Sequence, residues 1–123
     1  MSSKNKAGGN GLKKEPYRDY VTECFRQYGA AMARQSIATG YVEIQNCLAV
    51  SLTMVALSPE ARDAVTAVYI RDAEKCMGRG EIKRRVTAHA LKTFRSEESV
   101  YLMLRAARNL CAEKRGLKEE SLQ

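Results

Sequence analysis

Apolar side chains recur every three or four residues along most of this chain, which is the spacing of helices that bury one face. The pattern predicts five helices, running from after Pro16 to near Gly40, from Tyr41 to about Leu57, from Pro59 to Gly78 or Gly80, from Glu81 to Phe94 and from Glu97 to Arg115. We therefore expect an all-α protein, a compact bundle of about five helices forming a single domain over residues 16–123. Residues 1–15 are rich in glycine, serine, asparagine and lysine, which predicts a flexible basic arm.

The apolar stripe of each helix identifies the side chains expected in the core. They are Tyr20, Val21, Cys24, Phe25, Tyr28 and Met32 in the first helix, Ile44, Leu48, Leu52 and Val55 in the second, Ala61, Val65, Val68 and Tyr69 in the third, Ile82, Val86, Ala90 and Phe94 in the fourth, and Val100, Leu104, Ala107 and Cys111 in the last. The second helix lies in the longest uncharged run, Ile44 to Pro59. This run is too short and too polar to span a bilayer, so we expect no membrane partner and predict the most buried helix of the fold.

Capping residues mark where two of the helices begin. Ser58 and Ser96 suit the N-cap position, because a serine hydroxyl accepts a hydrogen bond from an amide in the first turn. Pro59 is favourable at the first helical position, and Gly116 is a typical residue just beyond a helix end. The last helix is predicted to turn its apolar side to the core. Its other side, facing water or a polyanion, carries Tyr101, Arg105, Arg108 and Arg115.

Positive charge is concentrated in the C-terminal half of the chain. The formal net charge is +7, and the segment from Arg79 to Lys118 alone holds eleven Lys or Arg against four Glu, a balance of +7. The segment from Val21 to Gly78 holds five bases against six acids, a balance of −1. A basic half of this kind favours a nucleic acid or another polyanion as partner.

The residues that carry enzyme or metal chemistry are sparse. Cys24, Cys47, Cys76 and Cys111 stand singly, and His89 is the only histidine, so the sequence has neither zinc-site spacing nor a redox pair. It also has no phosphate loop, zincin helix or nucleophile elbow. We therefore expect no enzyme, no metal and no cofactor. Free thiols and the lack of a secretory signal pattern favour a cytoplasmic location.

The segment from Ser96 to Arg108, SEESVYLMLRAAR, follows a basic helix after a short turn. It resembles the fourth-region domain of bacterial sigma factors and the phage transcription regulators that reuse it. In that family the form Ser-Glu-x-Thr-Val-Tyr-x-x-Leu-x-x-Ala-Arg opens the recognition helix. The matching positions are Ser96, Glu97, Ser99, Val100, Tyr101, Leu104, Ala107 and Arg108. The chain departs from the family where Thr93-Phe94-Arg95 replaces a Leu-Gly-Ile type of turn, and where Val86-Thr87-Ala88-His89 lacks the usual Ile-Ala pair.

The resemblance implies a C-terminal helix-turn-helix unit over residues 58–118, with residues 16–57 as supporting or dimerising helices. The implied function is sequence-specific binding of double-stranded DNA by a transcriptional regulator, with the helix starting near Glu97 in the major groove. Base contacts are then expected from Glu98, Tyr101, Leu102 and Arg105. Phosphate contacts are expected from Arg84, Arg85, Lys92, Arg95, Arg108 and Arg115.

Other functions fit the same sequence features. A non-enzymatic helical interaction protein, or an inhibitor from a mobile element, would bind a protein or a ribonucleoprotein, and RNA polymerase is one partner of that kind. A structural homodimer would pair the apolar second helix across a two-fold axis. In either case Arg105 and Arg108 would be ordinary residues of a solvated helix face.

Overall fold

The computed structural model describes residues 15–36, 40–75, 78 and 80–119, and within these residues it contains helices and no strand. The α-helices are α2 (Arg18–Arg34), α3 (Tyr41–Ala56), α4 (Pro59–Val65), α5 (Glu81–Thr93) and α6 (Glu97–Arg115). A π-helical segment (Thr66–Ile70) continues α4, and a short 3-10 turn (Ala73–Lys75) follows it. The predicted all-α fold is confirmed. Residues 1–14 of the predicted arm lie outside the described residues.

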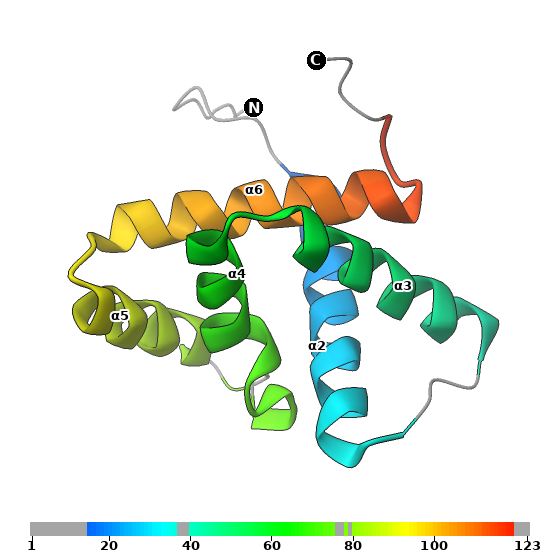
Figure 1. The fold of residues 1–123 in the computed structure, drawn as a ribbon, viewed down its shortest axis with the longest axis horizontal. Helices are drawn as coiled ribbons and strands as arrows, with labels where there is room; N and C mark the ends of the chain where they lie inside the picture. Colours follow the sequence, from blue (N-terminus) through cyan, green and yellow to red (C-terminus); the bar gives the residue numbers. More distant parts are fainter. Residues whose placement is uncertain (1–14, 37–39, 76–77, 79, 120–123) are drawn as a thin grey trace, which may run out of the picture.

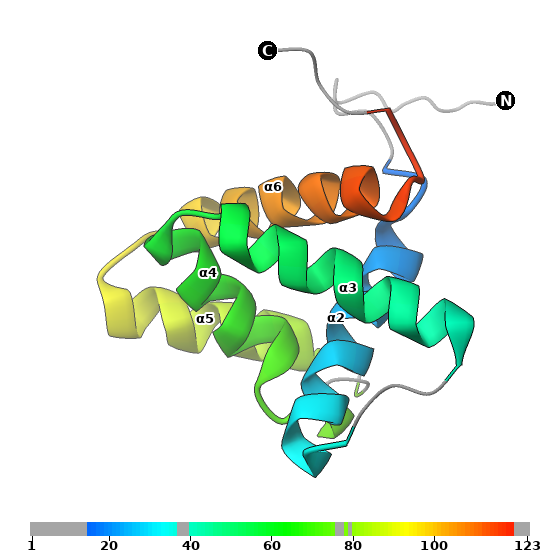
Figure 2. The ribbon, with the colours of Figure 1, turned by 45° about the vertical axis from the view of Figure 1, so that its right-hand side comes forward.

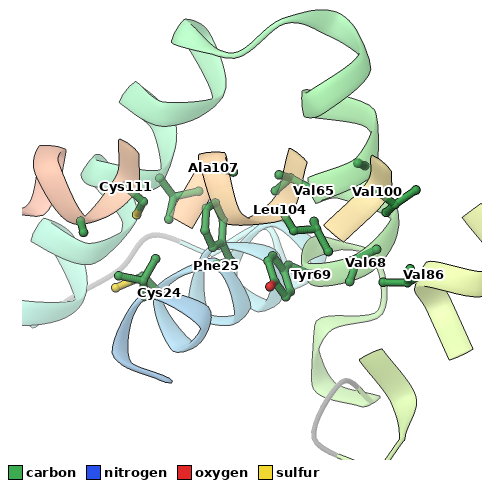
Figure 3. Packing of buried hydrophobic residues seen from close by; sticks show 14 of the residues in the cluster. Cys24, Phe25, Val65, Val68, Tyr69, Val86, Val100, Leu104, Ala107 and Cys111 are labelled. Atoms are coloured by element: carbon green, nitrogen blue, oxygen red, sulfur yellow. The ribbon is translucent and has the colours of Figure 1, made fainter. Parts of the chain in front are cut away.

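The last helix, α6, organises the bundle because it contacts each of α2, α3, α4 and α5. Figure 1 shows α6 lying along one side of the molecule with the other helices beneath it. The core follows the buried side of α6, where Leu104 belongs to one cluster with Phe25 from α2 and Val65 from α4 (Figure 3). The ring of Phe25 also stacks on Tyr69, with ring centroids 5.4 Å apart. The stripe predicted for α6 is buried as expected.

Both predicted serine caps are present. The Ser58 hydroxyl accepts a hydrogen bond from the Ala61 amide at 3.2 Å, and the Ser96 hydroxyl accepts one from the Ser99 amide at 3.0 Å. The third helix ends earlier than predicted, because α4 gives way to the π-helical segment, which stops at Ile70. The first helix likewise ends at Arg34 rather than near Gly40.

Gly29 lets α2 pack directly against the end of the π-helical segment. A Cβ at this position would collide with the Ile70 carbonyl oxygen and would lie 2.9 Å from the Ala73 Cβ. The two segments therefore approach at a point where only glycine fits without a shift of the backbone.

The orientation of α3 is opposite to the sequence prediction. Its buried residues are Asn46, Ala49, Val50 and Thr53. The stripe predicted to be inward, which comprises Ile44, Leu48, Leu52 and Val55, is exposed. The prediction that α3 is the most buried helix is therefore wrong, and Figure 2 shows α3 at the front of the molecule with α2 behind it.

A hydrogen-bond network at Asn46 accounts for this orientation. The Asn46 side chain accepts hydrogen bonds from the Tyr20 hydroxyl at 3.0 Å and the Arg115 guanidinium at 2.7 Å. Its amide nitrogen donates to the Gln27 side chain at 3.1 Å. Because a buried amide is stable only when it is hydrogen-bonded, these three partners hold the Asn46 face of α3 against α2 and α6.

Further expectations need correction. Tyr20 and Met32, predicted on the buried stripe of the first helix, are exposed. Phe94, predicted to face the core, is 96% exposed, because α5 ends at Thr93 and the chain turns away there. Glu15, which was placed in the arm, belongs to the folded domain, because its carboxylate pairs with Arg108. Within the described residues, no helix combines the length and the apolar character needed to cross a membrane.

Candidate nucleic-acid interface

Arg108 is an internal side chain, although the sequence placed it on the outer face of α6. It is 5% exposed. Its guanidinium donates to both Glu15 carboxylate oxygens, at 2.7 and 2.9 Å, and to the Tyr69 hydroxyl at 2.9 Å. Burial opposes both charges, yet the ion pair lowers the pKa of Glu15 and raises the pKa of Arg108. Arg108 thus ties the chain just before α2 to α6, and we leave it out of the candidate interface.

Arg85 is also internal, at 7% exposed. It donates to the carbonyl oxygens of Val68 at 3.0 Å, Arg71 at 2.6 Å and Asp72 at 2.9 Å. It also donates to the Glu81 carboxylate at 2.8 Å. Carbonyls near a helix end lack intrahelical partners, and here the guanidinium supplies them. Arg85 therefore connects α5 to the end of the π-helical segment, and we exclude it from the candidate interface as well.

Arg115 is partly buried and donates its hydrogen bond to Asn46 inside the bundle. Three of the six predicted phosphate contacts therefore have internal partners. The other three, Arg84, Lys92 and Arg95, are exposed on α5 and the turn that follows it.

A groove between α5 and the π-helical segment brings two of these exposed cations together. It has a volume of about 350 Å³, and Arg84 and Lys92 line it from α5. Arg71 lines it from the other side and is exposed, and sequence reasoning missed this residue because it follows a different helix. Burial, together with the neighbouring cations, lowers the pKa of His89 in the same wall, so the imidazole is neutral at pH 7.

Arg84 and Arg85 both pair with the Glu81 carboxylate. Arg84 donates to it at 2.6 and 3.1 Å while its own side chain stays 68% exposed. Hydrogen bonds from Arg84 and Arg85 lower the pKa of Glu81 to about 2, so Glu81 is ionised at neutral pH. The Arg84 side of this pair is open to solvent, whereas the Glu81 side chain is only 18% exposed.

The four predicted base-contact residues lie along one side of α6. Glu98, Tyr101 and Leu102 are exposed, and Arg105 is partly buried next to Glu15. The first turn of α6 is anchored to α5, because the Thr87 hydroxyl donates to the Glu97 carboxylate at 3.0 Å. Glu98 and Leu102 also border a groove of about 540 Å³ between α6 and the corner that joins α3 to α4. The predicted base-contact residues thus share one face of α6, on which Glu98, Tyr101 and Leu102 are exposed.

The turn between α5 and α6 has an unusual residue at its tightest point. Phe94 has a φ of 58°, the left-handed region that favours glycine, and its ring is almost fully exposed. The Arg95 amide donates to the Ala90 carbonyl at 2.9 Å and the Phe94 amide to the Leu91 carbonyl at 3.4 Å, as in a Schellman motif. The end of α6 has the same bonding pattern with Gly116 in that place. Phe94 is therefore unfavourable for the turn and contributes no burial to the core.

Comparison with protein-family models, with curated proteins and with solved structures finds no match for this chain. Within the described residues, no three His, Cys, Asp or Glu side chains gather as a metal site would require. Cys24, Cys47 and Cys111 are free thiols. The exposed cations of α5 and the outer face of α6 are therefore the features from which a function is argued.

Proposed function

We propose that this chain is a sequence-specific, non-enzymatic regulator that binds double-stranded DNA. In this proposal the start of α6 enters the major groove and α5 lies across the phosphate backbone. The observation that carries it is the three-residue turn at Phe94, which joins the basic α5 to a serine-capped α6 whose first turns are exposed. Helix-turn-helix units use a turn of three or four residues, often with glycine in it. The left-handed backbone at Phe94 is the conformation that such a glycine would adopt.

Base recognition falls to the exposed side of α6. Tyr101 and Arg105 carry hydrogen-bond donors, and an arginine can bond a guanine through two donors at once. Leu102 offers an apolar surface for a thymine methyl group, and Glu98 can accept a hydrogen bond from a cytosine amino group. These residues would distinguish one sequence from another.

Phosphate binding falls to Arg84, Lys92 and Arg95, with Arg71 added on the far wall of the groove. For each bound subunit, four phosphate contacts predict a plot of log affinity against log salt with a slope of about −3 to −4, because each contact contributes about −0.9. The six contacts predicted from the sequence would give about −5. The salt slope therefore distinguishes the revised set of contacts from the original one.

The test is binding of the full chain to a random pool of short DNA duplexes over a salt series, followed by sequencing of the bound fraction. We expect one enriched sequence and, for each bound subunit, a slope in the range given above. Enrichment of no sequence, or no binding at low salt, would overturn the proposal and would favour a protein or ribonucleoprotein partner.

A pair of variants separates the two roles. Arg105→Ala should reduce the preference among sequences, whereas Lys92→Ala should weaken binding to all sequences alike and make the salt slope shallower by about 1. The matched control is Lys114→Ala, which removes an exposed cation from the opposite end of α6. Equal losses for the Lys92 and Lys114 variants would show that binding follows net charge rather than the surface described above.

A further inference from the structure

The outer face of α3 carries a continuous apolar stripe that the fold leaves uncovered. Its members are exposed by 41% to 80%, and they are Tyr41, Ile44, Leu48, Leu52 and Val55. At 100° per residue, these five positions fall within an arc of about 80° on the helix surface. The opposite face of α3 is the one that packs on α2 and α6. This helix is therefore apolar on two opposite sides, and only one of them is buried.

The borders of the stripe resemble those of a protein interface. Gln45 flanks it on one side and Ser51 on the other, both partly buried. Glu43, the only charged residue of α3, points more than about 90° away from the stripe by helical position. An apolar centre with a polar margin and no charge is the composition expected of an interface core.

The spacing of the stripe identifies the partner that fits it. From Tyr41 to Val55 the intervals are three, four, four and three residues, so the stripe is symmetric about Leu48. Two copies of α3 laid antiparallel across a two-fold axis at Leu48 would match Ile44 with the partner's Leu52 and Tyr41 with the partner's Val55. A two-fold interface requires self-complementarity of this kind, because the same patch must serve both subunits.

The size of the stripe is also suitable. At these exposures the five residues offer on the order of 500 Å² of surface, which is the size of the largest apolar patch on a typical monomer, and such patches often serve in binding. A standard interface takes about 800 Å² from each partner, so the stripe supplies most of it and the polar margin can supply the rest. No like charges would be brought together at its centre.

We propose that the outer face of α3 binds a second copy of this chain, forming an antiparallel α3–α3 pair centred on Leu48. The proposal does not rest on DNA binding. A protein that dimerises without binding DNA, or binds DNA as a monomer, would separate the two proposals.

The first test is sedimentation equilibrium of the full chain and of Leu48→Glu. We expect a dimer for the unchanged chain and at least a 30-fold higher dissociation constant for the variant, the loss typical of a central interface residue. Leu91→Glu is the control, since Leu91 is an exposed apolar residue of α5 and its change should leave the dimer intact. Circular dichroism checks that both variants fold. A monomer at every concentration, or a dimer that resists Leu48→Glu, would overturn the proposal.

Single cysteines test the symmetry in a background carrying Cys47→Ser and Cys76→Ser. Leu48→Cys should form a disulfide with its own copy under mild oxidation. Val55→Cys should not do so alone, because the two Val55 positions would be about 21 Å apart along the pair, but it should link to Tyr41→Cys in a mixture. Self-linking at both Leu48 and Val55 would indicate a parallel pair and would contradict the antiparallel arrangement.

Discussion

Replacing Phe94 with glycine should make the protein more stable and weaken the binding to DNA that we propose for it. The left-handed backbone at this position costs a residue with a Cβ about 1 to 2 kcal/mol. The ring is 96% exposed, so glycine gives up almost no buried apolar surface. Glycine also enlarges the unfolded ensemble, which costs about 0.4 to 1 kcal/mol. The difference is a net gain of roughly 0.5 to 1 kcal/mol in the free energy of unfolding.

Thermal and urea unfolding measure the first effect, and the salt-series binding assay measures the second. A gain of that size raises the melting temperature of a domain like this one by about 3 to 6 °C. Binding to the enriched duplex should weaken about fivefold or more, because Phe94 lies at the turn between Lys92 and Arg95 and offers an apolar contact worth about 1 kcal/mol.

Gln35→Gly is the matched control for both measurements. Gln35 occupies the same position at the end of α2, with a φ of 53° and the same pair of hydrogen bonds. This variant should gain stability in the same range and leave DNA binding unchanged. A loss of stability in Phe94→Gly would mean that the ring packs on the fold, and unchanged DNA binding would remove Phe94 from the interface.

Three other predictions follow from the packing and the ion pairs. Gly29→Ala should destabilise the fold by about 1 to 3 kcal/mol in urea unfolding, because the new Cβ collides with the Ile70 carbonyl; an unchanged urea midpoint would refute the close approach. Asn46→Ala should cost about 1 to 3 kcal/mol, since it removes a buried amide together with its three part-buried hydrogen bonds, and a stability equal to the parent would mean that water replaces the amide. The folded-state pKa of Glu15 lies below its ordinary value of 4.5, so its pair with Arg108 stabilises the protein above that pH and the stability is lost as the pH falls through the lowered pKa. Glu15→Gln should therefore flatten the fall in melting temperature below pH 4.5, and an identical pH profile for the variant and the parent would contradict this.

The helix starts could be predicted from the sequence because their causes are local. Ser58 and Ser96 cap α4 and α6 through hydrogen bonds to amides three residues away, and such bonds depend on little else. The helix ends were less predictable where tertiary contacts decide them. The end of the π-helical segment is one example, since its carbonyls are satisfied by Arg85, which lies 13 to 17 residues further along the chain.

Which side of each helix is buried could be predicted only in part. The prediction for α6 was right because the side of this helix opposite its apolar stripe is plainly polar. The prediction for α3 was wrong because both sides of this helix carry apolar or small residues. Which side is buried depended on a hydrogen bond between Asn46 and Arg115, 69 residues apart. The role of each arginine was beyond sequence reasoning for the same reason. Arg108 and Arg105 are three residues apart on one helix, yet a carboxylate from outside α6 draws Arg108 into the core.

The α3 stripe and the exposed face of α6 make a joint prediction, because one hydrogen-bonded contact connects their helices. Arg115 of α6 holds Asn46 on the inner face of α3. The proposed dimer face of α3 and the proposed base-contact face of α6 therefore move as one body. A dimer would then present two recognition helices with a fixed separation, and helix-turn-helix dimers bind half-sites about one helical turn of DNA apart. We expect the enriched sequence to be a palindrome and the Leu48→Glu monomer to bind a single half-site with about half the salt slope. A palindrome bound with the same slope by Leu48→Glu would show that the two subunits meet on the DNA by some other face.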